Sequence, residues 1–443
     1  MISLTAVLVP LFAVALLPFL FVLVVYSVAW TAYLLVAQQD PPPYALLGSA
    51  ALARLIPFLP LAPLRCVKVV KASAQYVWAC LWNIRIAHDW FLRYVYYTRA
   101  KERGEPIFDT IPYGIPFSRQ VLDVYPAPRT AGPEPRSTLA APEVTGLGIQ
   151  RGVPVLVIVP APILPSSILG HRKTYLQLAL SMRKLGYCVV VPDITYYPAS
   201  RIRQSVIDLR LALSWVGAHI SSYGGNPASI YVMGFGLSAH LVSLTLIQEA
   251  TVLSHTLVVN AIAHGEESSA GASPHGALQA EKREQVAMRL KNLEIYVPQV
   301  RLPHLAGVVL LAGVSDVVKE YRHEMEQGTE HLSYLRRSSG PSHGQCLLHS
   351  PAHLLVESRG IVDPSFLPPK FLLIHGGKDQ VVPISHSTLL NTLLSEAGVK
   401  QVEMRAYREL GHLETLTSLL TIPCQKDSAY APQLLADVRE FIS

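Results

Sequence analysis

The sequence predicts an α/β protein whose mostly parallel sheet is covered by helices on both faces. Short β-branched and apolar runs alternate with longer segments in which apolar residues recur at helical spacing. The clearest example lies at 229–250, where the apolar run Ile230–Met233 leads through a glycine-rich turn into a helical pattern. Such alternation favours strand–helix–strand units with parallel strands. In front of this pattern, an apolar N-terminal stretch predicts a transmembrane helix.

Composition excludes several classes of protein. Of the 443 residues, 50% are apolar and only 15% are charged, which is more hydrophobic than an ordinary soluble chain. The five cysteines have no CxxC spacing, so neither a disulfide framework nor a zinc site is expected. The net charge of +6 comes without a basic run interleaved with stacking aromatics in the main domain. We therefore expect no nucleic-acid partner, no metal and no cofactor.

The apolar excess is concentrated at the N-terminus. Between Met1 and Ala53 the single charged side chain is Asp40, and the run 2–37 exceeds the ~20 residues that span a bilayer. A secretory signal peptide is disfavoured because no basic segment precedes the run. We expect a single-pass anchor over 1–39, with a membrane-embedded hairpin as the alternative.

Residues 40–104 are predicted to be basic and aromatic helices close to the membrane. Bases outnumber acids strongly here, which by the positive-inside tendency places the following domain in the cytosol. The same interval is rich in aromatic residues, which suit the level of the lipid headgroups. We expect attachment to the endoplasmic reticulum membrane. A helix that simply packs on the domain is the other interpretation.

The remaining residues, 105–443, are predicted to form one α/β domain. The expected buried strands are 153–159, 187–191, 230–233, 305–311, 370–374 and 401–407, and the main expected helices are 174–185, 203–223 and 433–442. Three segments interrupt this pattern: a proline-rich loop at 126–152, a polar insertion at 263–292, and a charged helical stretch at 316–338 that is a candidate lid.

The turn after the strand at 230–233 has the steric pattern of a nucleophile elbow. That motif is G-x-S-x-G, with small residues two before and two after the nucleophile because the turn is tight. The register with Gly234 and Ser238 as the small flanking residues places Gly236 at the nucleophile position. A second register makes Ser238 the nucleophile but puts the bulky His240 at a small-residue position.

Several stretches together resemble the α/β-hydrolase superfamily, and within it the carboxylesterases similar to prenylcysteine methylesterases and to feruloyl and acetylxylan esterases. The stretches that carry the resemblance are TIPYGIPFSRQVLDVYPAP (110–128), YCVVVPDITYYP (187–198), WVGAHISSYGGNPASIYVMG (215–234), HGGKDQVVP (375–383) and GHLETL (411–416). The resemblance implies the α/β-hydrolase fold and a Ser–His–Asp hydrolytic site.

Carried onto this sequence, the resemblance implies Asp379 as the triad acid and His412 as the general base. Ser238 is the hydroxyl proposed as nucleophile, because Gly236 has no side chain. The oxyanion loop also departs from the family, since Pro160-Ala161-Pro162 stands where related esterases carry His-Gly-Gly. Two prolines remove two N–H donors from a loop that should aim donors at a developing oxyanion.

Two functions follow from these observations. The first is a membrane-anchored carboxylic-ester hydrolase acting on an apolar or lipid-linked ester, with Ser238, His412 and Asp379 as its catalytic residues. The second is a catalytically silent protein of the same fold, which serves as a membrane-tethered binding or scaffold protein. Retention of the acid and the base favours the first function, and Gly236 with the proline-containing loop favours the second.

Overall fold

The computed structural model divides into two compact units, each described here by itself. One unit consists of residues 1–87 and 319–337, and the other of residues 88–318 and 338–443. The structure describes residues 16, 18–31, 61–82, 84–102, 108–114, 120–127, 152–161, 171–197, 199–266, 300–330, 333–340, 342–420 and 430–443. Most of the apolar run 2–37, the loop 126–152 and the insertion 263–292 lie outside the described residues.

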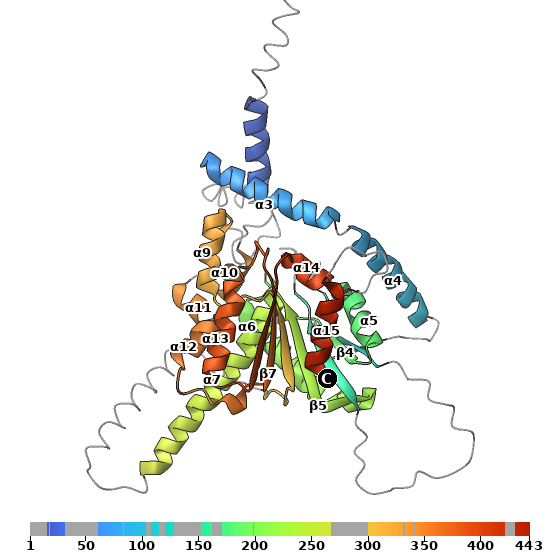
Figure 1. The fold of residues 1–443 in the computed structure, drawn as a ribbon, viewed down its shortest axis with the longest axis vertical. Coiled ribbons are helices and arrows are strands. Elements are labelled where there is room, and N and C mark those ends of the chain that lie inside the picture. The colour runs from blue at the N-terminus through green and yellow to red at the C-terminus, as the bar shows by residue number, and fades with distance from the viewer. Residues whose placement is uncertain are drawn as a thin grey trace, which may run out of the picture. The chain divides into compact units, whose positions relative to one another are not determined.

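The larger unit is built on an eight-stranded sheet in the order β1-β2-β4-β3-β5-β6-β7-β8 (Figure 1). β2 runs antiparallel to both of its neighbours, and all other neighbouring strands are parallel. The strands are β1 (Asp109–Pro112), β2 (Val121–Tyr125), β3 (Val153–Val159), β4 (Cys188–Pro192), β5 (Gly225–Phe235), β6 (Gly307–Leu311), β7 (Lys370–Gly376) and β8 (Gln401–Tyr407).

The predicted strand pattern is confirmed. β3 and β8 have the predicted bounds, and the other predicted strands differ from the observed ones by a few residues at their ends. The central strands are apolar at nearly every position because helices cover both faces of the sheet, which is typical of parallel sheets.

The helices of the larger unit form two layers (Figure 1). α6 (Ile202–His219), α7 (Leu237–Glu266), α12 (Pro351–Glu357) and α13 (Ser385–Glu396) pack together on one face. α5 (Leu176–Lys184) and α15 (Ala431–Ile442), with α14 (His412–Thr417) at the strand ends, share a hydrophobic cluster on the other face. Side chains of each strand point alternately to these two layers.

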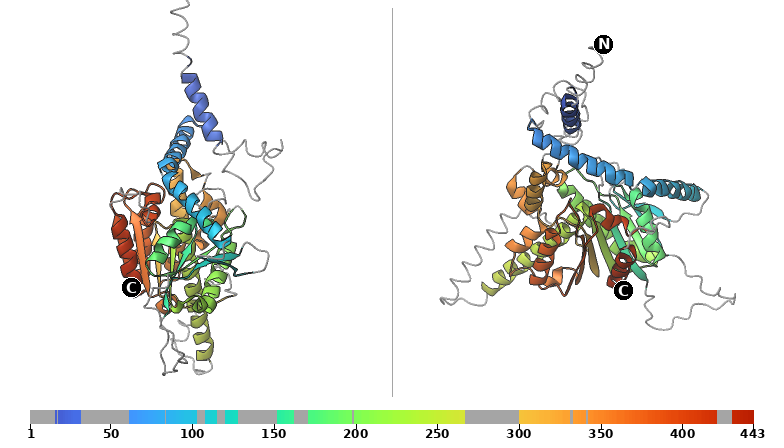
Figure 2. Two further views of the ribbon diagram at one scale, coloured as in Figure 1. Left: turned by 90° about the vertical axis from the view of Figure 1, so that its right-hand side faces the viewer. Right: turned by 45° about the horizontal axis from the view of Figure 1, so that its top comes forward.

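The longest helix, α7, follows directly from β5 and continues beyond the sheet, as Figures 1 and 2 show. Among the described residues, its stretch Leu237–Val258 is the one segment long and apolar enough to cross a bilayer, but 72% of the most apolar stretch is buried inside the domain. α7 is therefore the central core helix of the domain. The part of the N-terminal helix that the structure describes, Pro18–Thr31, is apolar and has fewer residues than a membrane span requires.

α4 (Ile84–Glu102) packs on the larger unit from His88 onward. Trp90 and Tyr94 lie against the hydrophobic cluster of α5 and α15, and Trp90 Nε1 donates a hydrogen bond to the carbonyl oxygen of Lys173 at 2.8 Å. Phe91 and Tyr96 on the opposite side are more than half exposed. This part of the basic and aromatic segment therefore packs on the domain and also presents aromatic residues to the outside.

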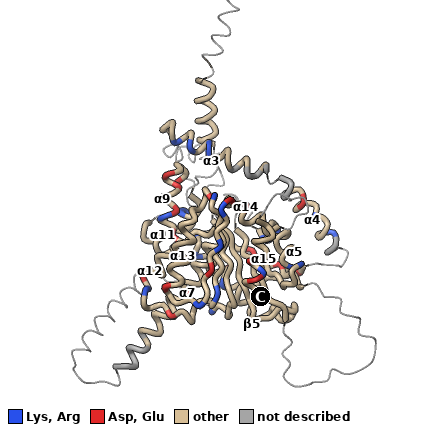
Figure 3. Tube along the Cα trace, in the orientation of Figure 1, with Lys and Arg blue, Asp and Glu red and all other residues tan. Residues whose placement is uncertain are grey.

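The smaller unit contains the helix Pro18–Thr31, α3 (Pro63–Trp82) and most of α9 (Val317–Gln327). Val25 and Ala29 of the first helix are buried together with Cys66 and Val69 of α3. The segment after α9 is held to α3 by an ion pair between Arg65 and Glu330 at 2.9 Å. Figure 3 shows the basic residues of α3 and the acidic residues of α9.

Candidate active site

The turn between β5 and α7 places Gly236 at its tip. Gly236 has a φ of 53°, in the left-handed region that glycine adopts without a steric penalty. Its N–H donates to the carbonyl oxygen of Leu311 on β6 at 2.8 Å, and its carbonyl oxygen accepts from the N–H of His240 at 3.1 Å. These bonds fix the turn at the carboxyl end of the sheet, so the structure has the register with Gly236 at the nucleophile position.

Steric crowding explains the small residues on either side of this tip. A Cβ on Gly234 would lie 2.7 Å from the backbone nitrogen of Ala239, so a side chain cannot be accommodated without moving α7. Ser238, two residues after the tip, is buried and contacts the end of β5. The tight strand–turn–helix geometry is therefore imposed by Gly234, Gly236 and Ser238.

The hydroxyl of Ser238 is used inside the turn. Its Oγ accepts a hydrogen bond from the N–H of Phe235 at 2.9 Å and donates to the carbonyl oxygen of Phe235 at 3.1 Å. The residue is 0% exposed. The structure thus places Ser238 as a brace of the elbow, with its hydroxyl bound to backbone and not to His412.

Asp379 and His412 are brought together from two loops that follow neighbouring strands. Asp379 lies after β7, and His412 is the first residue of α14, after β8. His412 Nδ1 and Asp379 Oδ2 are 2.7 Å apart, and the Asp379 side chain is fully buried. His412 is 18% exposed on its side chain, and its ring packs against Phe235 with the ring centroids 4.7 Å apart.

The surroundings of Asp379 hold its carboxyl in the ionised form. Burial works against ionisation, but hydrogen bonds from His375, His412 and the N–H of Val382 outweigh it, so the pKa of the carboxyl lies well below its usual range. The N–H groups of Val381 and Val382 each donate to Oδ1 at 2.9 Å. The carboxylate is therefore fixed in position and in charge.

His375 is a second histidine on the same carboxylate, and sequence reasoning did not single it out. It lies near the end of β7, fully buried, with Nε2 3.4 Å from Asp379 Oδ2 and 2.9 Å from the carbonyl oxygen of Val382. Nδ1 lies 2.7 Å from the Oγ of Ser387 on α13. The signal in the sequence is its spacing, four residues before Asp379 at a strand end.

The side of His412 that faces away from Asp379 is directed at the tip of the elbow. A Cβ built on Gly236 would lie 3.3 Å from His412 Nε2 and 3.6 Å from Cε1. A serine at 236 would therefore bring its hydroxyl to this nitrogen. The structure assembles an acid, a base and an elbow in the spatial order of a hydrolase triad, with a glycine at the third position.

The described residues directly after β3, Pro160 and Ala161, leave no backbone N–H free for this site. The N–H of Ala161 donates to the hydroxyl of Tyr175 at 2.9 Å, and Pro160 has no N–H to give. The carbonyl oxygen of Pro160 accepts from Tyr196 at 2.5 Å. Pro162 lies outside the described residues. Burial raises the pKa of Tyr175 to about 12, so this hydroxyl is protonated at neutral pH.

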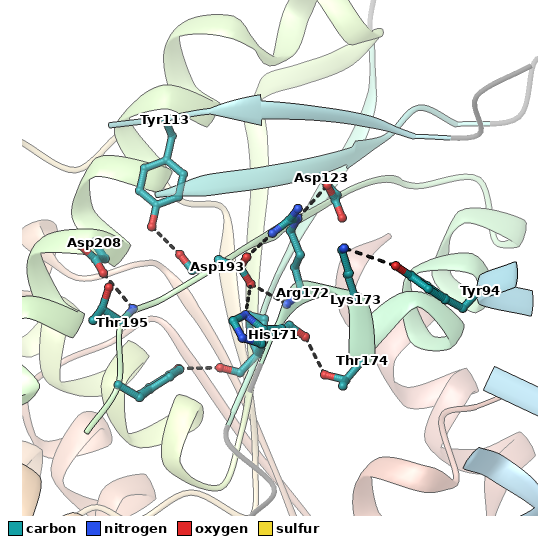
Figure 4. A network of polar contacts seen from close by, with 12 residues as sticks. Tyr94, Tyr113, Asp123, His171, Arg172, Lys173, Thr174, Asp193, Thr195 and Asp208 are labelled. Carbon is teal, nitrogen blue, oxygen red and sulfur yellow. Dashed lines mark hydrogen bonds and ion pairs between the residues drawn. The ribbon is translucent and has the colours of Figure 1, made fainter. Parts of the chain in front are cut away.

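Tyr175 is itself positioned by a polar network at the start of its short helix, η2 (Arg172–Tyr175), shown in Figure 4. Arg172 forms ion pairs with Asp123 on β2, at 2.9 Å, and with Asp193 after β4. Burial raises the pKa of Asp123, and the neighbouring Arg172 opposes that rise. The network ties η2 to β2 and to the segment that follows β4.

The described residues contain no group of three or more His, Cys, Asp or Glu side chains arranged to hold a metal ion. His240, buried on α7, has its Nδ1 2.9 Å from the carbonyl oxygen of Val314, and burial lowers its pKa to about 4. It is therefore a neutral core histidine. The chemistry that the site offers is acid–base chemistry by His412 and Asp379.

Comparison with known proteins assigns the chain to a family. The BD-FAE family model matches residues 168–394, about half of the chain, from the segment before η2 into the last turn of α13. The chain belongs to the BD-FAE family. The resemblance to α/β-hydrolase carboxylesterases that the sequence predicted is thereby confirmed. This BD-FAE match includes the elbow, His375 and Asp379, and it ends before His412.

Curated relatives of this BD-FAE chain include esterases. Esterase LipQ of Mycobacterium tuberculosis is 24% identical over 300 residues, covering 68% of this chain and 55% of LipQ. The probable isoprenylcysteine alpha-carbonyl methylesterase ICME of Oryza sativa is 24% identical over 302 residues, covering 67% of this chain and 59% of that protein. The matched part thus spans a little over half the length of these relatives.

Among solved structures, Esterase B from Lactobacillus rhamnosis superposes with a TM-score of 0.49 at 15% sequence identity, covering 85% of this chain and 95% of that chain.

Proposed function

We propose that this protein is a carboxylic-ester hydrolase of the α/β-hydrolase fold. The observation that carries the proposal is the hydrogen bond of 2.7 Å between His412 Nδ1 and Asp379 Oδ2, with Nε2 directed at the tip of the elbow. A base held this way takes a proton from an attacking hydroxyl and returns it to the leaving alcohol. Membership in the BD-FAE family and relatives named as esterases support the same reaction.

The proposed substrate is an apolar or lipid-linked ester, and the proposed location is the cytosolic face of the endoplasmic reticulum membrane, with a single-pass anchor at the N-terminus. The uncharged run 2–37 supports the anchor. Apolar side chains of α3 recur at three- and four-residue intervals on an exposed face, among them Leu64, Trp78 and Leu81, each more than half exposed. Lys71 lies on that face, which suits contact with anionic headgroups.

The hydrolase proposal is tested with the full-length protein in detergent. Initial rates are measured on p-nitrophenyl esters from acetate to palmitate, for the wild type and for His412→Ala. We expect hydrolysis by the wild type, faster with the longer acyl chains, and a loss of roughly 10²–10⁴-fold in His412→Ala. Equal rates for the two proteins on every ester would refute the proposal.

The membrane proposal has its own test. Carbonate extraction of cell membranes should leave the full chain in the pellet, and removal of residues 1–39 should release it. Protease added to intact microsomes should cleave the hydrolase domain if that domain faces the cytosol. Release of the full chain by carbonate would contradict the anchor.

A catalytically silent, membrane-tethered binding protein is the second candidate function. It is favoured by Gly236, which puts no nucleophile at the tip of the elbow, and by the commitment of the Ala161 N–H to Tyr175. On this view the site binds an apolar ligand without cleaving it. Binding of a radiolabelled long-chain ester, recovered intact after prolonged incubation, is the outcome that would favour this function.

A further inference from the structure

We propose that the hydrolysis occurs without a covalent intermediate: His412 activates a water molecule directly, at the position that a serine side chain would take on residue 236. This inference rests on the proposed hydrolase function and specifies its mechanism. It starts from a conflict in the site, because the acid and the base are fully assembled while the residue they face has no side chain.

The geometry around His412 Nε2 carries the inference. Because a Cβ on Gly236 would already be 3.3 Å from Nε2, the position beyond it is within hydrogen-bond distance of this nitrogen. In this chain that position is not filled by residue 236. A water molecule placed there donates its proton to Nε2, as a serine hydroxyl would.

The neighbouring hydroxyl does not replace the missing one. Ser238 Oγ is bound to both the N–H and the carbonyl oxygen of Phe235 and is fully buried. For Ser238 to attack an ester, both hydrogen bonds would have to break and the side chain would have to leave its buried position. The bonds that hold the elbow together therefore argue for water as the attacking group.

His412 is held in the tautomer that can accept a proton from an attacking water molecule. The ionised Asp379 carboxylate, held by Val381 and Val382, accepts the Nδ1 proton of His412 and leaves the Nε2 lone pair to receive a proton. Asp379 also stabilises the imidazolium that forms. Phe235 packs against the ring and keeps it in this orientation.

The reaction balances with water as the co-reactant. The water oxygen forms a bond to the acyl carbon while its proton moves to Nε2, and the carbonyl π electrons move to the oxygen. When the tetrahedral species collapses, the bond from carbon to the alkoxy oxygen breaks and the alkoxide takes the proton from Nε2. The products are a carboxylic acid and an alcohol, and the enzyme is regenerated in a single displacement.

Three measurements on the full-length protein test this mechanism with p-nitrophenyl butyrate and a fluorophosphonate probe. The wild type should hydrolyse the ester without a burst of p-nitrophenol, show no acyl adduct by mass spectrometry after acid quench, and resist the probe. Gly236→Ser should gain probe labelling at residue 236, a burst, and at least a tenfold higher kcat/KM. This variant also shows that the probe reaches the site.

The matched control for added bulk is Gly236→Ala. The alanine keeps the left-handed backbone of residue 236, and its methyl group lies 3.3 Å from His412 Nε2, too close to the proposed water for both to fit. Activity should therefore fall to the level of His412→Ala. Gly344→Ala makes the same change at a glycine with no atom within 4 Å of the added Cβ, and should leave activity unchanged.

The outcomes separate the mechanism from the function. An acyl or phosphonyl adduct on Ser238, or on any other residue of the active wild type, overturns direct water attack and leaves the hydrolase proposal standing. Unchanged activity in a folded Gly236→Ala protein also overturns the mechanism. A wild type that is inert on every ester, like His412→Ala, overturns both.

Discussion

Replacing Asp379 with asparagine tests how the site controls the proton on His412. The side chain keeps its shape, so one oxygen can still accept from the N–H groups of Val381 and Val382. The amide NH₂ then faces His412 Nδ1, which is 2.7 Å from the acid in the wild type. To avoid two opposed donors, His412 must give up the Nδ1 proton and carry it on Nε2.

A histidine protonated on Nε2 cannot act as the base toward the elbow. We therefore expect Asp379→Asn to lower kcat by roughly 10⁴-fold, the cost of the wrong tautomer in such triads. The free energy of unfolding should also fall by about 1–2 kcal/mol at pH 7, because hydrogen bonds to an ionised carboxylate are replaced by weaker bonds to a neutral amide.

The stability loss should depend on pH in a defined direction. The folded-state pKa of Asp379 is depressed, so its contribution is fully present above the unfolded pKa of about 3.9 and is lost as the pH falls through the folded value. Wild type and variant should therefore differ by the same amount from pH 8 to pH 5, and the difference should begin to shrink below about pH 4.

The measurements are steady-state kinetics, urea unfolding between pH 3 and pH 8, and ¹⁵N NMR of the imidazole, which reports the tautomer directly even at low turnover. Asp363→Asn is the matched control, since Asp363 caps a short helix through the N–H of Ser365, is only partly buried and contacts neither histidine of the site. A folded Asp379→Asn protein with kcat within tenfold of the wild type, or with the Nδ1 proton in place, would refute the reasoning.

Three other changes test the elbow and the smaller unit. Ser238→Ala should lower the free energy of unfolding in urea by about 1–3 kcal/mol, because it leaves buried backbone of Phe235 unpaired; an unchanged midpoint would contradict the bracing role. Gly234→Ala should cost about 1–3 kcal/mol or prevent folding, whereas Gly344→Ala should stay within about 1 kcal/mol of the wild type. Burial, reinforced by neighbouring acids, raises the pKa of Glu324 to about 8, above its unfolded value, so the carboxyl lowers stability increasingly as pH rises to that value. Glu324→Gln should therefore stabilise the smaller unit by up to about 4 kcal/mol at pH 8.5 and by nothing at pH 4, measured by thermal unfolding.

The positions of the strands were predictable because each central strand is a short run of apolar residues, a pattern that fits a buried strand better than a helix or a loop. Val153–Val159 and Gln401–Tyr407 were predicted with their observed bounds, since Gly and Pro or charged residues stop the pattern at each end. The charged stretch 316–338 was harder. Its sequence predicted one helical lid, whereas the structure has α9 ending at Gln327 and Glu330 buried in an ion pair with Arg65.

The sequence by itself determined the fold class and the position of the elbow, because apolar periodicity and the glycine pattern act over a few neighbouring residues. Its resemblance to the carboxylesterases supplied the positions of the acid and the base. It left open which of two residues stands at the tip. Only the tertiary structure decided this, since the φ of Gly236, the bonding of Ser238 to Phe235 and the approach of His412 all depend on loops from distant strands. The partnership of His375 with Asp379 was likewise decided by packing, because β7 and the loop that follows it fold back on each other only in the assembled sheet.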